Sequence, residues 1–118
     1  MKYFRVYADE TGESHFQDVE VEMTVSQMAG QSTPVAAAEV SFYRLSAELK
    51  ASPWHTSPRR QFVIYLEGNS EYETSDGDTR RVGPGSVLLM EDFQGKGHLN
   101  RNLSGERFLA TIPLADGA

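Results

Sequence analysis

Residues 61–67 read QFVIYLE and carry the strongest strand pattern in the chain. The segment is rich in aromatic and β-branched residues, and its apolar character on both faces predicts a strand that is buried on both sides. Turn signals follow it, a Gly-Asn pair at 68–69 and an Asp-Gly pair at 76–77, on either side of residues 70–75. Such pairs favour tight two-residue turns, so the segment predicts two successive hairpins.

Short strands separated by turn residues extend in both directions from this segment. Alternation of apolar and polar residues is unbroken over 19–25, and the Ser-, Gly- and Gln-rich stretch 26–34 is expected to be a loop. Residues 35–49 combine helix-favouring alanines with strand-favouring aromatics, and we expect a strand over 38–46. The other expected strands cover residues 2–7, 80–82, 87–90, 98–103 and 107–112. This spacing predicts a closed β-barrel or a two-sheet jelly roll, which leaves few strand edges unpaired.

The composition is that of one folded domain and excludes several classes of function. The chain has 118 residues, a formal net charge of -6 and no cysteine. An acidic surface repels phosphate backbones, which argues against nucleic acid as a partner. Without cysteine there are no disulfides, thiolate metal sites or cysteine nucleophiles. No apolar run approaches the ~20 residues of a membrane span, so we expect a cytoplasmic protein with no membrane partner.

Strand parity predicts which side chains share a face near residue 61. If the backbone is extended from residue 55 to residue 65, every second side chain points to the same side. That face holds His55, Ser57, Arg59, Gln61, Val63 and Tyr65. Burying an amide or an imidazole without partners costs roughly 1 to 3 kcal/mol. This polar face is therefore expected to bind a ligand, to form internal hydrogen bonds or to line a wet pocket.

Residues 55–102 resemble the paired motifs of the cupin superfamily. The first cupin motif has two histidines separated by one residue, then a glutamate and a later glycine. The segment HTSPRRQFVIYLEG places His55 on the first histidine and Gly68 on the glycine. Ser57 and Gln61 stand in place of the second histidine and the acid. The resemblance implies a pocket at His55 with an altered set of ligands.

The second cupin motif begins at a glycine and ends in a histidine followed by an asparagine. Gly85 matches its opening, and His98 and Asn102 match its end. The segment EDFQGKGH, residues 91–98, replaces the usual Pro-x-Gly element. With WHTSPRRQF before it, this segment is similar to a group of small bacterial cupins with no assigned activity.

The resemblance implies an all-β fold, a cupin-type jelly-roll β-barrel that occupies residues 1–118 as a single domain. Its motif-bearing core spans residues 54–114, and the N-terminal strands within 2–25 pack on the barrel or swap onto it. Small cupins commonly pair through an N-terminal strand, so the alternating segment 19–25 predicts a homodimer.

A metal centre is the first functional expectation that follows from this resemblance. His55, Gln61 and His98 would hold a divalent ion, completed by water, substrate or Glu91. Imidazole and oxygen ligands suit Zn, Fe, Mn or Ni, and an open position lets such an ion polarise a carbonyl or activate water. We expect lyase, isomerase or oxygenase chemistry on a small anionic or aromatic organic molecule.

Metal-free acid-base catalysis is the second expectation. His98 or His55 would act as the base and a tyrosine, Tyr65 or Tyr43, as the acid. A carboxylate of the Glu-Asp pair at 91–92 would orient the imidazole of His98. Epimerases, cyclases and dehydratases on barrels of this type use such proton transfers.

A non-catalytic module that binds a small ligand is the third expectation. Its pocket would be built from Trp54, Tyr43, Tyr65, Met90 and Phe93, since ligand sites are mostly apolar with a few placed polar groups. The same aromatic residues are equally typical of an ordinary core.

Three basic residues favour an anionic ligand. An arginine beside an aromatic pocket binds a carboxylate through two hydrogen bonds, and Arg59 and Arg60 are placed for this role. Lys96 lies in a glycine-flanked loop, where it would act from a lid or donate to the same anion. His15 has no matching partner in the sequence and is expected at the surface.

Overall fold

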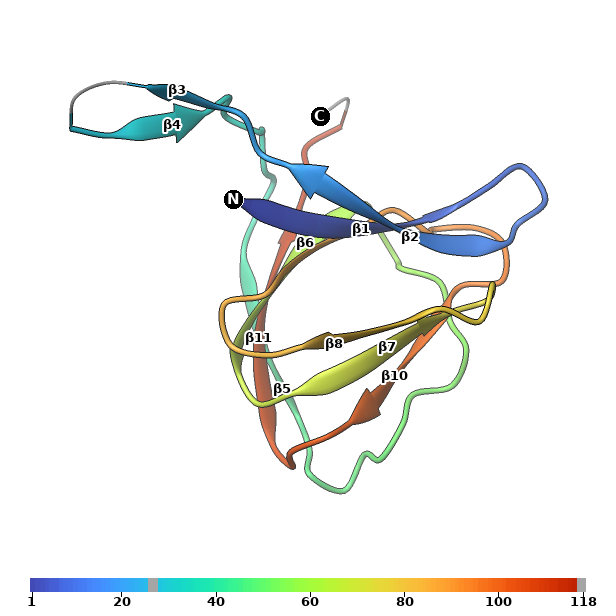
Figure 1. Cartoon of the computed structure of the whole chain (residues 1–118). Coiled ribbons are helices and arrows are strands. Elements are labelled where there is room, and N and C mark those ends of the chain that lie inside the picture. The colour runs from blue at the N-terminus through green and yellow to red at the C-terminus, as the bar shows by residue number, and fades with distance from the viewer. Residues whose placement is uncertain (26–27, 117–118) are drawn as a thin grey trace.

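The computed structural model describes residues 1–25 and 28–116, and this part of the chain folds into strands, turns and loops without a helix (Figure 1). About half of the chain lies in strands. Within the described ranges there is accordingly no helix of the length and apolar character that a membrane span requires. The chain is therefore an all-β protein, as its alternation predicted.

The larger of its sheets has six strands in the order β2-β1-β9-β6-β11-β5. Their bounds are β1 (Lys2–Ala8), β2 (Ser14–Glu20), β5 (Ser41–Leu45), β6 (Gln61–Glu67), β9 (Val87–Met90) and β11 (Arg107–Pro113). Strands β1 and β9 run parallel, and the other neighbours run antiparallel. The segment QFVIYLE thus occupies an interior position, between β9 and β11.

A second sheet has three strands in the order β10-β7-β8, and a separate two-stranded unit pairs β3 with β4. Their bounds are β7 (Ser70–Thr74), β8 (Thr79–Val82), β10 (His98–Asn102), β3 (Met23–Val25) and β4 (Gly30–Ser32). Figure 1 shows the three-stranded sheet below β1 and β2, and β3 and β4 extending away from the body. No strand of the described chain joins the two main sheets, so the expected closed barrel is not formed.

The core lies between the two main sheets and follows strand parity. Val63 and Tyr65 of β6 are buried with Leu109 of β11, and they meet Tyr72 of β7. On the opposite face of β6, Leu66 is 46% exposed. The prediction that this strand is buried on both sides is therefore wrong, because only the inner face of the larger sheet is covered by a second sheet.

The turn at Gly68 moves the chain from one sheet to the other instead of closing a hairpin. Strand β6 already has β9 and β11 on its two edges, so β7 finds no free edge there and pairs with β8 and β10. Gly68 has a φ of 83°, and a Cβ at this position would lie 2.7 Å from Cγ of Arg107. Only the Asp-Gly turn, residues 76–77, closes a predicted hairpin, between β7 and β8.

Two N-terminal predictions are corrected. The expected strand over 19–25 is split into the end of β2 and β3, because Glu20 pairs with Lys2 and the partner strand β1 extends no further. The expected loop over 26–34 contains β4, which pairs with β3, while residues 26–27 lie outside the described part. The strand expected over 38–46 is confirmed in its centre, as β5.

Candidate functional site

A cavity of about 190 Å³ lies between the two main sheets. Strands β5, β6, β9 and β11 form one wall, β7 and β10 form the opposite wall, and the segment 55–58 completes the lining. Its polar lining residues are His55, Ser57, Gln61, Tyr72, His98, Asn100 and Thr111. Tyr43, Leu45, Pro58, Val63, Met90 and Leu109 supply the rest of the wall. A small cavity with several convergent polar groups is typical of a binding site for a small molecule.

His98 is held in one orientation by a buried carboxylate. The imidazole is almost fully buried at the start of β10, and its Nδ1 lies 2.5 Å from Oδ2 of Asp92, which is wholly buried. An ionised carboxylate only accepts hydrogen bonds, so Nδ1 carries the proton of the neutral ring. The lone pair is then on Nε2, which has no hydrogen-bond partner within the described chain.

His55 repeats this arrangement with a backbone oxygen. Its Nδ1 lies 2.8 Å from the carbonyl oxygen of Pro53, which accepts and never donates, so the neutral ring again has its lone pair on Nε2. His55 and His98 exchange two backbone hydrogen bonds of 2.9 Å, and their ring centroids are 4.5 Å apart. Two imidazoles with the same available nitrogen therefore line the same cavity.

Tyr72, which the sequence analysis did not identify, packs against the ring of His98. Tyr72 stacks on the His98 ring with centroids 5.8 Å apart, and its hydroxyl lies 3.1 Å from that of Tyr65. Burial raises the pKa of the Tyr72 phenol well above its ordinary value, and the adjacent Tyr65 adds to the rise. Tyr72 thus stays protonated. Ser70, Tyr72 and Thr74 lie on the same face of β7, and this alternation could have predicted that Tyr72 is buried.

Sequence reasoning also missed Arg107, which is fully buried behind the cavity wall. Its Nη1 donates to Oγ of Ser70 at 2.8 Å and to Oδ1 of Asn100 at 3.2 Å. Its Nη2 donates to the carbonyl oxygen of Leu49 at 3.3 Å. A single sequence gives little warning of a buried arginine, since this residue type is almost always at the surface.

The structure brings several predicted residues together at the cavity. The three predicted metal ligands, His55, Gln61 and His98, all line it, as do Tyr43 and Met90. The three predicted metal ligands come from three separate segments. They converge because Gln61 and His98 point inward from β6 and β10, and because residues 55 and 98 pair through their backbones.

Other predicted residues lie elsewhere. Tyr65 is fully buried in the core, where its hydroxyl donates to Ser70. Glu91 forms ion pairs with Arg5 at 3.1 Å and with Arg60 at 2.6 Å, whereas the neighbouring Asp92 contacts His98. These ion pairs direct the Glu91 carboxylate away from the two histidines.

The predicted anion-binding arginines border a different feature. Arg59, Arg60 and Phe93 line an open groove of about 1000 Å³, outside the central cavity. The chain bends at residues 58–60, so the strict alternation expected up to residue 65 is broken and Arg59 leaves the inner face. Arg59 pairs with Glu39 at 3.0 Å.

Trp54 and Lys96 are also outside the central cavity. Trp54 is 46% exposed, and Lys96 pairs with Glu13 at 2.5 Å. The backbone N–H of Lys96 donates to the carbonyl oxygen of Gly12 at 2.8 Å. This loop is therefore fastened to the β1–β2 turn and does not present its lysine to the cavity.

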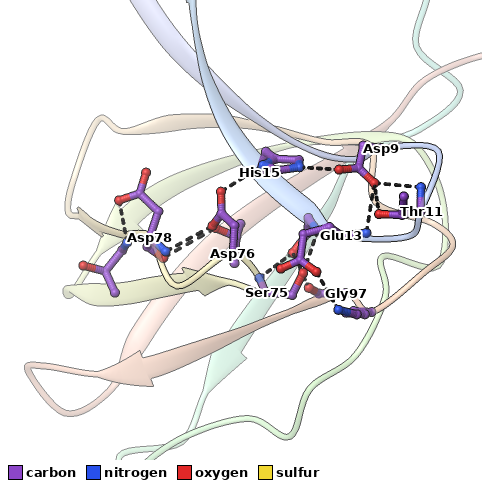
Figure 2. A network of polar contacts seen from close by, with 12 residues as sticks. Asp9, Thr11, Glu13, His15, Ser75, Asp76, Asp78 and Gly97 are labelled. Carbon is purple, nitrogen blue, oxygen red and sulfur yellow. Dashed lines mark hydrogen bonds and ion pairs between the residues drawn. The ribbon is translucent and has the colours of Figure 1, made fainter.

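A polar network fastens the turn between β1 and β2 to the rest of the molecule (Figure 2). His15 lies between two carboxylates, with Nε2 2.6 Å from Asp9 and Nδ1 2.9 Å from Asp76. The hydrogen bond with Asp9 and the contact with Asp76 outweigh burial and raise the pKa of His15. The same hydrogen bond is the main reason that the pKa of Asp9 lies far below its ordinary value. The residue expected as an isolated surface histidine therefore joins two turns.

The predicted metal ligands provide a weak donor set for a resident divalent ion. Two imidazoles and the Gln61 amide are all neutral, and the closest carboxylate, Asp92, is engaged with Nδ1 of His98. Within residues 1–25 and 28–116 no three histidine, aspartate or glutamate side chains are grouped as a metal site requires. Typical catalytic sites for such ions combine imidazole with at least one anionic ligand or use three histidines. These residues would hold such an ion weakly, through two imidazole nitrogens and the amide oxygen of Gln61.

Comparisons with known proteins add information about the fold. No family model matches the chain, and no curated protein matches its sequence. Among solved structures, protein NMB1881 from Neisseria meningitidis is similar over 81% of this chain and 83% of its own, with a TM-score of 0.52 and 16% sequence identity. The likeness shows that the same all-β arrangement occurs in a second chain.

Proposed function

We propose that this chain is a small-molecule enzyme in which His98, oriented by Asp92, moves a proton at a carbon next to a carbonyl group. The observation that carries the proposal is the pair of imidazoles, each with Nδ1 bonded to an oxygen acceptor and Nε2 left for a molecule in the cavity. A base whose tautomer is fixed by a carboxylate is a recurring arrangement for proton transfer. The proposed reaction class is an isomerase or a lyase.

His98, His55 and Gln61 each have a role in this proposal. Nε2 of His98 takes the proton, the electrons of the broken C–H bond move onto the carbonyl oxygen, and the positive imidazolium is stabilised by Asp92. The His98 imidazolium then returns this proton from Nε2 to the neighbouring carbon or to the oxygen, while His55, whose neutral ring has its lone pair on Nε2, accepts a hydrogen bond from the substrate. The Gln61 side chain has no hydrogen bond within the described chain and is free to donate to the developing oxyanion.

The size of the cavity limits the substrate. A cavity of about 190 Å³ is slightly larger than the ~150 Å³ site that holds benzene in an engineered protein. A single ring or a chain of a few carbon atoms therefore fits.

Hydrogen exchange at carbon tests the proposal. Small carbonyl compounds such as pyruvate and dihydroxyacetone are incubated with the protein in D₂O, and deuterium uptake at carbon is followed by NMR. The parent accelerates exchange of at least one compound, and His98→Gln lowers the rate by about 100-fold or more, the usual contribution of a general base. His15→Gln is the matched control, because this histidine lies in the turn network. Equal rates with and without His98 would exclude the mechanism.

A metal-dependent reaction is the second proposal, favoured by the two available Nε2 atoms. Bound Zn, Fe, Mn or Ni would polarise a carbonyl oxygen of the substrate, with His55, Gln61 and His98 as its ligands. Metal content is measured by mass spectrometry on protein purified without a histidine tag, for the parent and for His98→Ala. A stoichiometric metal that disappears in the variant favours this proposal over the metal-free one.

We also propose that the chain is a member of the cupin superfamily whose jelly roll is open. Its support is the motif positions: His55, Gln61 and His98 converge on one cavity between two sheets. The likeness to NMB1881 concerns the fold and names no activity. A non-catalytic ligand-binding role is the outcome to adopt if ligands bind in the cavity and no exchange occurs.

A further inference from the structure

Arg107 is a buried cation whose partners are all neutral. Its guanidinium is fully buried, and within the described chain it donates to Ser70, Asn100 and the carbonyl oxygen of Leu49. Its Nε has no hydrogen-bond partner there. Taking a charge out of water without a counter-ion is costly, so a buried cation of this kind favours an anion in its neighbourhood.

Asn100 connects this cation to the cavity. Because arginine only donates, the atom 3.2 Å from Nη1 of Arg107 is the amide oxygen of Asn100. The amide nitrogen is then on the other branch of the side chain, and it has no hydrogen bond within the described chain. Asn100 lines the cavity, so its N–H group is a donor for a ligand, polarised by the arginine behind it.

The two charged groups next to the cavity contact different residues of its wall. Arg107 contacts Asn100, whereas Asp92 contacts His98, two residues earlier in β10. Two residues of a strand span about 7 Å. Tyr72 pairs with Asn100 across the sheet and stacks on His98, so it lies between the two charged groups. A molecule with one anionic end is therefore oriented with that end toward Asn100 and its body beside His98.

We propose that Asn100, backed by Arg107, binds the carboxylate group of the ligand. This assignment rests on the proposed use of the cavity as a substrate site and specifies the substrate class as a small monocarboxylate. It also replaces the surface arginines as the source of anion selectivity, since Arg59 is paired with Glu39 and borders another groove. Asn100 is the contacting residue, and Arg107 is a positioning residue that fixes which end of the amide faces the cavity.

The test compares acids with their amides. Acetate against acetamide and benzoate against benzamide are titrated at millimolar concentrations into ¹⁵N-labelled parent and variant, and the backbone amide resonances of the cavity-lining residues Tyr72 and Leu109 are followed. In the parent, at least one acid binds at least tenfold more tightly than its amide. Asn100→Asp turns the donor into an acceptor while keeping a partner for Arg107, and it abolishes this preference.

Gln17→Glu is the matched control, because it is also an amide-to-acid change beside an arginine. The Gln17 oxygen accepts from Nε of Arg5 at 2.5 Å, on the exposed strand β2. This variant keeps the preference for acids. Thermal melting of both variants verifies that they are folded, which avoids reliance on Arg107 variants that disturb the core.

Two results overturn the assignment. One is equal or absent binding of acids and amides in the parent, and the other is an unchanged preference in folded Asn100→Asp. These results are separate from the failure of the catalytic proposal. Selective acid binding without deuterium uptake leaves the carboxylate site intact and removes the reaction, whereas His98-dependent uptake that favours neutral compounds retains the reaction and removes the carboxylate site.

Discussion

Asp92 decides which nitrogen His98 offers to the cavity. The carboxylate oxygen Oδ2 is bonded to Nδ1, and the second oxygen, Oδ1, is buried without a partner in the described chain. A buried charged group that lacks part of its hydrogen bonding is costly to keep, and such groups cluster where a protein needs a defined protonation state. The residue therefore contributes more to the orientation of His98 than to stability.

Asp92→Asn tests this orientation directly. The amide is the same size as the carboxylate, but it no longer stabilises an imidazolium and can bond Nδ1 in either sense. We expect the deuterium exchange rate to fall by about 10- to 1000-fold, while the melting temperature stays within a few degrees or rises. A variant with normal exchange would show that Asp92 has only a structural role.

Gly97 permits the close approach of the two histidine segments. It has a φ of 75°, and a Cβ at this position would lie 2.2 Å from the carbonyl oxygen of His55. Gly97→Ala is expected to lower the free energy of unfolding by about 3 kcal/mol, from backbone strain together with the clash. Gly77→Ala has a similar φ of 88° and open space around it, so it should cost only about 1 kcal/mol. Denaturant unfolding of both variants measures the difference, and equal losses would contradict the clash.

At the scale of elements, the β1–β2 turn is joined to the β7–β8 turn by side chains and backbone together. Oγ of Ser14 donates to the carbonyl oxygen of Gly97 and accepts from the N–H of Ser75, while His15 bridges Asp9 and Asp76. Gly97 precedes the first residue of β10, so the hydrogen bond from Ser14 also fixes the start of the strand that carries His98.

The bridge of His15 makes stability depend on pH in a defined direction. The folded pKa of His15 is raised above its ordinary value of 6.5, so the folded state binds the proton more tightly than the unfolded chain does. The contribution of the bridge is complete below pH 6.5 and is lost as pH rises through the folded pKa of His15. At low pH it is lost again when Asp9 and Asp76 take up protons, since their pKa values are lowered.

Urea denaturation of the parent and His15→Gln over a range of pH tests this. The parent should be more stable by about 1 kcal/mol just below pH 6.5, the scale of partly exposed ion pairs, and the difference should shrink toward alkaline pH. High salt should reduce it. A difference that grows with pH would contradict the bridge.

Local alternation was sufficient to predict most strands but not the sheet that each strand joins. Residues 61–67 and 87–90 form strands at the predicted bounds, because their patterns are complete within the segment. The position of β7 depends on β9 and β11 occupying both edges of β6, and β11 lies about forty residues further along the chain. Pairing at that distance leaves no trace in a local pattern.

The candidate site was predictable where it lies on strands and not where it lies on loops. Parity placed Gln61 on the inner face, and the motif resemblance brought His55 and His98 together. The sequence could not show whether Glu91 or Asp92 orients His98, because both residues follow the end of β9, where strand alternation no longer applies. Asn100 shares the face of His98 by parity, but its role appears only through the buried Arg107.

At the scale of the whole molecule, two open sheets leave strand edges. The larger sheet ends in β2 and β5, and the smaller one in β8 and β10. Isolated edges are templates for pairing with another chain, and proteins cover them or pair them. Of the segment 19–25 that was predicted to pair in a dimer, only residues 19–20 belong to the edge strand β2.

Light scattering coupled to gel filtration tests the homodimer. We expect a mass near twice the 13.1 kDa of one chain, because the outer edge of β2 is unpaired within the described chain. A 13 kDa species at all working concentrations would contradict the dimer, and would mean that the charged residues of β2 suffice to protect its edge.

The parallel pairing of β1 with β9 has a consequence for biosynthesis. Phe4 pairs with Leu88, so β1 is synthesised more than seventy residues before one of its two neighbours in the sheet. The β1–β2 pair alone is a two-stranded unit, which is marginally stable in water. Contacts between such distant residues also slow folding, because a long loop must close before they form. We therefore expect β1 to join the larger sheet late in folding, with the β1–β2 pair open to aggregation until β9 has been made.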